Sequence, residues 1–137
     1  VVVVVVVTIY LGCRLFATFA FLFVESSTVH FILCHNLLSR VIIFDDEIST
    51  GSTLITTVRT LKKAGVNAIF VGATHPVLCG NAVGNLKAAD VTEIVVSNTV
   101  HISEEKLFSK LKVLSTASLF ARAILRIHTG ESVSALF

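Results

Sequence analysis

Cysteine and proline are scarce in this sequence. Its 137 residues include three cysteines and a single proline, Pro76. The cysteines form no Cys-x-x-Cys pair, so neither a disulfide framework nor a zinc site is indicated, and a reducing compartment, the cytoplasm, is expected. No proline- or serine-rich linker divides the chain, and its length suits about one domain.

Charge is scarce as well. Charged residues make up 15% of the chain, against about 25% in an average soluble domain, and the formal net charge is +2. So small a net charge gives no basis for nucleic-acid binding. Hydrophobic residues make up 54% of the sequence, which excludes intrinsic disorder because a disordered chain needs low hydrophobicity and high net charge.

The beginning of the chain differs in composition from the rest. Residues 1–40 hold only three charged side chains, those of Arg14, Glu25 and Arg40. The remaining 97 residues hold nine of the 11 lysines and arginines and eight of the nine acidic residues. We therefore divide the chain into an apolar low-complexity segment, 1–40, and a domain, 41–137.

The apolar stretch 1–24 has three interpretations. We favour sequence that is foreign to the following domain, from a truncated or misjoined gene model. Buried strands come second, because the seven consecutive valines are β-branched and prefer extended backbone. A membrane anchor comes last: 24 helical residues would span about 36 Å, but Arg14 would lie near the middle, where a charge is costly.

From Val41 onward, short apolar runs alternate with amphipathic segments. The apolar runs predict strands and the amphipathic segments predict helices. The expected strands are 41–44, 68–72, 93–96 and 111–114, and the expected helices are 54–64, 81–89 and 116–127. Strands that alternate with helices form parallel sheets with right-handed crossovers, so the pattern predicts an α/β fold with an open parallel sheet.

The strongest chemical signal follows the first of these strands. Asp45 and Asp46 come directly after the apolar run, and the sequence Thr-Gly-Ser-Thr, residues 50–53, leads into the next helix. In open α/β sheets, ligands bind beyond the carboxyl ends of the strands. A helix N-terminus offers unpaired N–H groups and a partial positive charge to a phosphate, and Gly51 allows a close approach. The hydroxyl of Thr50, Ser52 or Thr53 can also cap the helix.

The two acids must serve another part of the ligand. They would repel a phosphate, but they can accept hydrogen bonds from sugar hydroxyls or hold a Mg²⁺ that bridges to substrate oxygens. Acids for a diol beside a turn for a monophosphate describe a pentose phosphate. The plainer interpretation is a capped helix after a strand, with Asp45 and Asp46 as ordinary loop carboxylates. The uninterrupted run of strand, acids and turn favours the functional interpretation.

The run VIIFDDEISTGST, residues 41–53, resembles the ribose-phosphate-binding signature of the type I phosphoribosyltransferase fold. The segments 74–77 and 110–137 are similar to one branch of that fold, the ribose-phosphate pyrophosphokinases (phosphoribosyl diphosphate synthases). The resemblance covers 41–137, the C-terminal third of a typical member. It implies an incomplete phosphoribosyltransferase-like domain with a three-layer open parallel sheet and an authentic C-terminus.

This resemblance implies an activity and a site. Family members use Mg²⁺ and transfer a diphosphate from ATP to the C1 hydroxyl of ribose 5-phosphate. By resemblance, Asp45 and Asp46 would hold the ribose hydroxyls, and the turn after them would wrap the 5-phosphate. That turn comprises Ser49, Thr50, Gly51, Ser52 and Thr53. Ser132 and Ser134 match tail residues that line a regulatory phosphate site shared between subunits, since family members are homo-oligomers.

The resemblance also implies a deficit. Family members bind ATP and Mg²⁺ largely through segments upstream of the acidic strand, whereas residues 1–40 contain no lysine and no match to those segments. We therefore expect a truncated fragment, assign it no catalytic residue and no metal ligand, and interpret His75 and His101 as structural. Two alternatives remain: a nucleobase phosphoribosyltransferase, against which the C-terminal tail argues, and a non-catalytic associated subunit or inactive fragment.

Overall fold

The computed structural model describes residues 4–11, 14–16 and 40–136. Most of the predicted low-complexity segment 1–40 therefore lies outside the described residues. Within that segment, Val4–Leu11 forms a strand, in agreement with the β preference of its valines.

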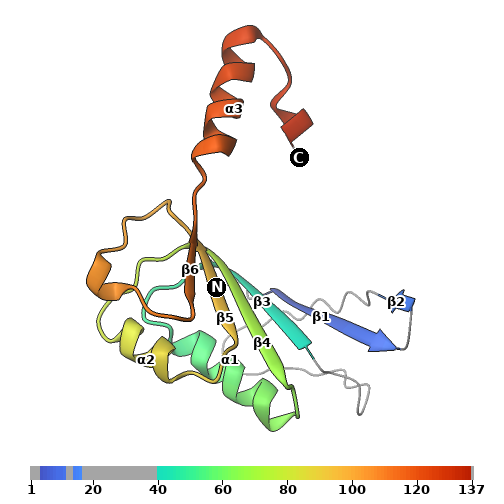
Figure 1. The fold of residues 1–137 in the computed structure, drawn as a ribbon, viewed down its shortest axis with the longest axis vertical. Helices are drawn as coiled ribbons and strands as arrows, with labels where there is room; N and C mark the ends of the chain where they lie inside the picture. The colour runs from blue at the N-terminus through green and yellow to red at the C-terminus, as the bar shows by residue number, and fades with distance from the viewer. Residues whose placement is uncertain (1–3, 12–13, 17–39, 137) are drawn as a thin grey trace.

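Six strands form one sheet, in the order β2-β1-β3-β4-β5-β6 (Figure 1). The last four in this order are parallel to one another, and β1 and β2 are added antiparallel at the β3 edge. The bounds are β1 Val4–Leu11, β2 Arg14–Phe16, β3 Arg40–Glu47, β4 Ala68–His75, β5 Glu93–Ser97 and β6 Leu111–Leu114. The predicted α/β fold with an open parallel sheet is confirmed.

Two helices cover one face of this sheet. Helix α1 (Ser52–Lys63) connects β3 to β4, and α2 (Ala82–Ala88) connects β4 to β5. Because each connection joins neighbouring parallel strands in the same direction, right-handed crossovers place both helices on the same face. The two helices contact each other there (Figure 1). The described residues thus form two layers, and the third layer of the predicted architecture is not among them.

The core lies between the sheet and these two helices. Alternate residues of the strands point toward the helices and are buried, as the period of two in a strand requires. The strand contributions are Val41, Ile43, Ile69, Val71, Ile94 and Val96, and the helix contributions are Leu54, Val58, Leu61 and Leu86. This packing fixes the end of β3 beside the beginning of α1, where the predicted site lies.

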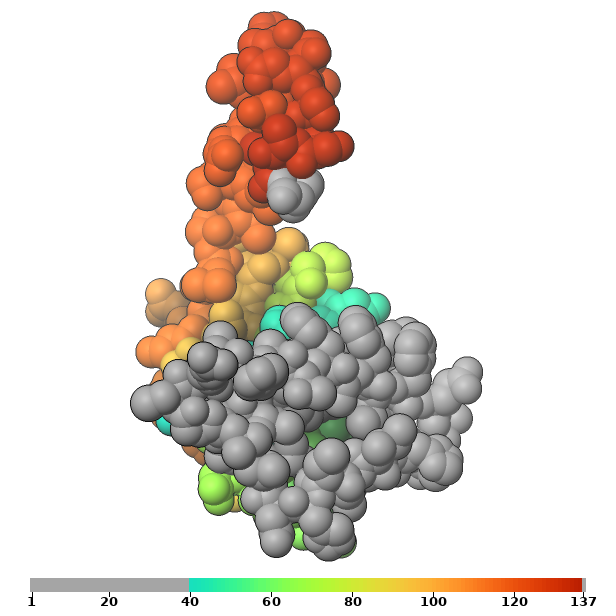
Figure 2. All heavy atoms as spheres, turned by 90° about the vertical axis from the view of Figure 1, so that its right-hand side faces the viewer, coloured from blue at the N-terminus to red at the C-terminus, as the bar shows by residue number. Residues whose placement is uncertain are grey.

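The C-terminal part of the chain leaves the sheet. Helix α3 (Ala117–Thr129) follows β6 and extends away from the sheet, as Figures 1 and 2 show. Its main partner is the 3-10 turn η2 (Val133–Leu136). None of its residues is buried, so its apolar side chains stay in contact with solvent.

Among the helices that the structure describes, none has both the length and the apolar character needed to cross a membrane.

Candidate functional site

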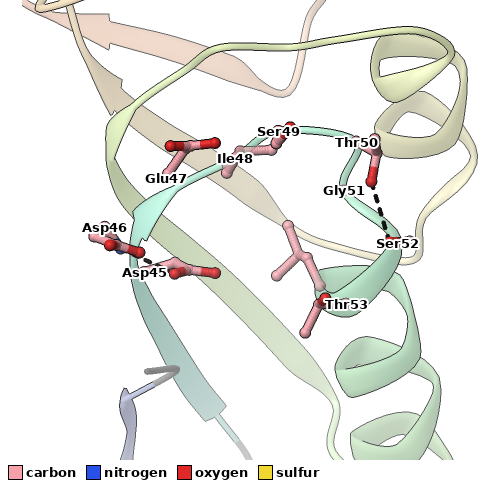
Figure 3. A pocket seen from close by; sticks show the side chains of 10 residues that line it. Asp45, Asp46, Glu47, Ile48, Ser49, Thr50, Gly51, Ser52 and Thr53 are labelled. Carbon is pink, nitrogen blue, oxygen red and sulfur yellow. Dashed lines mark hydrogen bonds between the residues drawn. The ribbon is translucent and has the colours of Figure 1, made fainter. Parts of the chain in front are cut away.

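A hollow of about 200 Å³ lies at the carboxyl end of β3 (Figure 3). The described residues that line it form one continuous stretch of chain, from Asp45 in the strand to Leu54 in the first turn of α1. The stretch includes every residue predicted to bind ribose 5-phosphate: Asp45, Asp46, Ser49, Thr50, Gly51, Ser52 and Thr53. The structure therefore brings these residues together, whereas Ser132 and Ser134 lie apart from them in the tail after α3.

The two acids belong to the strand itself. The strand expected to end at Phe44 continues to Glu47, because its pairing with β4 continues and aligns Asp45 with Ala73. Neighbouring residues of a strand point to opposite sides. Asp45 accordingly points toward Thr53, and Asp46 points to the other side of the strand (Figure 3). Both acids therefore lie in the strand, not in the loop where they were expected.

These acids differ in their protonation. Burial raises the pKa of Asp45 to about 6, and its side-chain hydrogen bond with Asp46 adds to the increase. The same hydrogen bond lowers the pKa of the exposed Asp46 carboxyl. Oδ1 of Asp45 also accepts the backbone N–H of Asp46 at 2.9 Å. Both groups are therefore mainly ionised at neutral pH, and as the pH falls Asp45 takes up a proton first.

The turn after β3 leaves the beginning of α1 open. Gly51 stands before the helix with φ of 74°, a left-handed conformation that glycine adopts without a steric penalty. The expectation that a hydroxyl of the turn caps the helix is wrong, since no side chain bonds to its N-terminus. Instead, the hydroxyls of Thr50 and Ser52 lie 3.1 Å apart and bond to each other. The unpaired N–H groups of the first helical turn thus remain available to an anion.

Hydrogen bonds hold this turn from behind. The carbonyl oxygens of Ile48, Ser49 and Thr50 each accept a hydrogen bond from the segment between β4 and the middle of α2. The donors are the backbone N–H groups of Leu78 and Cys79, both at 2.9 Å, and the side-chain amide of Asn85, at 3.4 Å.

These bonds also orient the N–H groups of the turn. Every described peptide bond is trans, so each C=O and the N–H of the following residue point in opposite directions. With the carbonyls of 48–50 directed toward the β4–α2 segment, the N–H groups of 49–51 point away from it. The hollow lies on that opposite side, since no residue of 75–85 lines it. The turn therefore presents a row of N–H donors to the hollow.

Leu78, Cys79 and Asn85 were not predicted from the sequence as parts of the site. They carry no chemical signature of an anion site, and they act mainly through backbone groups. The only available signal was topological. Because β3 and β4 are consecutive parallel neighbours, the turns that follow them must lie at the same edge of the sheet.

His75 has partners that fit a structural role. Its Nδ1 lies 2.9 Å from Oγ1 of Thr99, which in turn donates to the carbonyl oxygen of Thr74 at 2.9 Å. The carbonyl oxygen of His75 accepts the N–H of Ile48, also at 2.9 Å. This residue thus joins the ends of β4 and β5 to the start of the turn.

Oxygen donors for a metal are present, but they are few. Mg²⁺ prefers carboxylate and phosphate oxygens and keeps several waters, so Asp45 and Asp46 suit it chemically. Within the described residues, no three or more His, Cys, Asp or Glu side chains come together as a metal-binding group. Among the described residues that line the hollow, there is no lysine or arginine.

Residues 34–137 match the family model described as the phosphoribosyl synthetase-associated domain. This match covers well over half of the chain. The chain belongs to this family. The matched residues include every residue named above as lining the hollow, and the C-terminal tail. The match agrees with the resemblance seen in residues 41–53.

Curated relatives point to the same branch. The ribose-phosphate pyrophosphokinase of Caldanaerobacter subterraneus is 46% identical over 98 residues, which are 72% of this chain and 31% of that protein. The enzyme of the same name from Deinococcus radiodurans is 46% identical over 100 residues, 71% of this chain and 31% of its own. The predicted resemblance to this family is confirmed, and the chain spans about a third of the length of these relatives.

A solved structure shares the fold. The phosphoribosylpyrophosphate synthetase from Mycobacterium smegmatis superposes with a TM-score of 0.63 at 37% sequence identity. The superposition covers 65% of this chain and 30% of the other.

Proposed function

We propose that this chain forms the ribose 5-phosphate-binding part of a ribose-phosphate pyrophosphokinase. The reaction is the transfer of a diphosphate from ATP to ribose 5-phosphate, which yields phosphoribosyl diphosphate and AMP. The observation that carries the proposal is the hollow at the end of β3, whose lining runs from the two aspartates through the turn to the first residues of α1. The names of the matched relatives support the same reaction.

The two ends of the sugar phosphate would meet different groups. The N–H groups of the turn and of the first residues of α1, with the hydroxyls of Thr50, Ser52 and Thr53, would donate to the phosphate. The ionised carboxylates of Asp45 and Asp46 would accept hydrogen bonds from the ribose hydroxyls. This arrangement leaves C1 of the sugar free to react.

In the transfer step, the C1 oxygen would attack the β-phosphorus of ATP. The bond from that phosphorus to the oxygen of the α-phosphate would break, AMP would leave, and the C1 hydroxyl would lose its proton. Such a step is accelerated by positioning and by cations around the transferred group. Bound Mg²⁺ would neutralise part of the diphosphate charge, and Asp45 and Asp46 are the residues of this chain suited to hold it.

Other features of the proposal rest on the resemblance. We infer a cytoplasmic homo-oligomer that binds ATP mainly through residues outside this chain. Ser132 and Ser134 are proposed as part of a regulatory phosphate site. In the structure, the carbonyl oxygen of Ser132 accepts a hydrogen bond from Arg126 at 2.9 Å.

A non-catalytic associated subunit is the second candidate. It is favoured by one observation, the absence of lysine and arginine from the lining of the hollow. A nucleobase phosphoribosyltransferase is favoured by none, since the relatives named above are pyrophosphokinases. The pyrophosphokinase and the non-catalytic subunit would both bind the sugar phosphate, and only the pyrophosphokinase would turn it over.

Titration of the ¹⁵N-labelled chain with ribose 5-phosphate tests the proposal. We expect the amide signals of Thr50–Thr53 to shift, and ribose without phosphate to leave them nearly unmoved because the turn recognises the phosphate. Signals that stay in place at millimolar ribose 5-phosphate would exclude the site. Release of AMP from ATP and ribose 5-phosphate then separates the pyrophosphokinase from the non-catalytic subunit.

A further inference from the structure

Lys106 contacts the segment that supports residues 49–53, the anion-binding turn, and it is not in the lining of the hollow. It ends the 3-10 turn η1 (Glu104–Lys106), which lies between β5 and β6, and it is partly buried. Its Nζ donates a hydrogen bond of 3.1 Å to the carbonyl oxygen of Leu78, a residue 28 positions earlier in the chain. A partly buried ammonium bonded to a backbone carbonyl thus joins two distant connections of the sheet.

The bonded carbonyl belongs to a peptide group that also contacts the turn. The C=O of Leu78 and the N–H of Cys79 form one peptide group, and that N–H donates to the carbonyl oxygen of Ser49 at 2.9 Å. The C=O of Ser49 and the N–H of Thr50 form the next peptide group. A continuous path therefore runs from the Lys106 ammonium through two peptide groups to the Thr50 N–H, which points to the side of the hollow.

The backbone at Leu78 indicates that this path is held in place. Leu78 has φ of 50°, the only positive φ of a non-glycine residue in the described part of the chain. This conformation is unfavourable for any residue that has a Cβ atom, and it persists only where packing and hydrogen bonds hold the backbone in place. Here the side chain is buried, with 2% of its surface exposed, and both polar groups of the following peptide are bonded.

We propose that Lys106 is a positioning residue for the anion-binding turn, acting through the Leu78–Cys79 peptide on the Ser49–Thr50 peptide. Hydrogen-bonded peptide groups polarise one another, so the ammonium both orients the Thr50 N–H and strengthens it as a donor. The charge of a lysine thereby acts on a hollow whose described lining residues include no lysine or arginine. The inference rests on the proposed function, because the anion concerned is the phosphate of ribose 5-phosphate.

Lys110 provides a matched control. Its Nζ donates to the carbonyl oxygen of Ala89 at 3.0 Å, and it is partly buried like Lys106. Ala89 follows the end of α2, and its carbonyl is not one of the peptide groups that link Lys106 to Thr50. Replacing Lys110 therefore removes the same kind of hydrogen bond without touching the path to Thr50.

The experiment compares Lys106→Met, Lys106→Arg and Lys110→Met with the wild-type chain. It measures the affinity for ribose 5-phosphate and for ribose, the thermal midpoint Tm, and the hydrogen exchange of the Cys79 amide, which is bonded to Ser49. We expect Lys106→Met to weaken ribose 5-phosphate binding roughly tenfold, to leave ribose binding unchanged and to speed exchange at the Cys79 amide, whose hydrogen bond to Ser49 belongs to the path. Lys110→Met should keep the affinity within about twofold, and Lys106→Arg should recover most of it, because arginine keeps the charge and the donor.

The inference is overturned if Lys106→Met binds ribose 5-phosphate as tightly as the wild-type chain does. It is also overturned if Lys106→Met and Lys110→Met lose affinity equally, because an equal loss would indicate a general loss of stability. Failure of the wild-type chain to bind ribose 5-phosphate would overturn the proposed function instead. In that case, the exchange of the Cys79 amide without ligand still decides the positioning role. Unchanged exchange in Lys106→Met would exclude it, and faster exchange there that Lys110→Met does not reproduce would support it.

Discussion

At the carboxyl end of β3, Asp45 is a partly buried carboxylate in a hollow whose lining contains no lysine or arginine. Its pKa in the folded chain, about 6, lies above its ordinary value because burial disfavours the charged form. The folded state therefore holds this proton more tightly than the unfolded state. Asp45 stabilises the fold at low pH, and this contribution is lost as the pH rises through about 6.

We expect Asp45→Asn to raise Tm at pH 7 and to weaken ribose 5-phosphate binding. The substitution removes a desolvated charge, and after allowance for its solvent screening the expected rise is about 2–4 °C. The difference from wild type should grow between about pH 4 and pH 6, which thermal unfolding across that range measures. Asp46→Asn is the control: it removes an exposed carboxyl with a lowered pKa, so it should not raise Tm. Parallel pH profiles for wild type and Asp45→Asn would contradict this account.

At the scale of an element, α1 begins without the groups that usually stabilise a helix N-terminus. No acidic residue stands in its first turn, and no side chain caps it. The hydroxyls of Thr56 and Thr57 donate to the carbonyl oxygens of Ser52 and Thr53 within the helix. The positive end of the helix dipole is thus left to whatever anion enters the hollow.

Thr53→Asp should therefore separate helix stability from ligand binding. A carboxylate in the first turn interacts favourably with the dipole, by about 0.3–1 kcal/mol, so Tm should rise. The same charge repels the phosphate, and ribose 5-phosphate binding should fall by more than about tenfold. Calorimetry measures both effects, and the uncharged Thr53→Asn serves as the matched control. Undiminished binding in Thr53→Asp would place the phosphate elsewhere.

At the scale of the whole molecule, α3 stands apart from the core. Phe120, Ile124 and Ile127 lie near one another on its surface, at spacings of three and four residues, and are 58%, 65% and 68% exposed. The sheet and the α1–α2 layer have their own buried core and do not depend on these side chains. A contiguous apolar patch of this kind makes a chain prone to associate.

The double substitution Phe120→Ser with Ile124→Ser should reduce concentration-dependent light scattering. Because neither side chain is buried, Tm of the sheet domain should stay within about 2 °C of wild type. Leu86→Ala is the contrasting control, since Leu86 is fully buried. Its loss should cost about 2–5 kcal/mol and lower Tm strongly. A similar fall in Tm for the double variant would mean that α3 packs on the core in solution.

Much of the described fold was predictable from local patterns. The strands expected at 68–72, 93–96 and 111–114 and the three expected helices all appear, with small shifts at their ends. Apolar periodicity determines them, and Gly65 and Gly130 follow the ends of α1 and α3 with positive φ. The extension of β3 to Glu47 was not predicted. Aspartate is unfavourable in strands, but pairing with β4 continues through both acids.

The sequence by itself determined the residues of the hollow, because Asp45 to Leu54 is one continuous run and a strand followed by a helix brings its ends together locally. Only the tertiary structure decided which way the groups in that run point. The bonds from Leu78, Cys79 and Asn85, and the ammonium of Lys106 behind them, arrive from other connections of the sheet. Hydrogen bonds depend on distance and direction in space, and separation along the chain does not encode either.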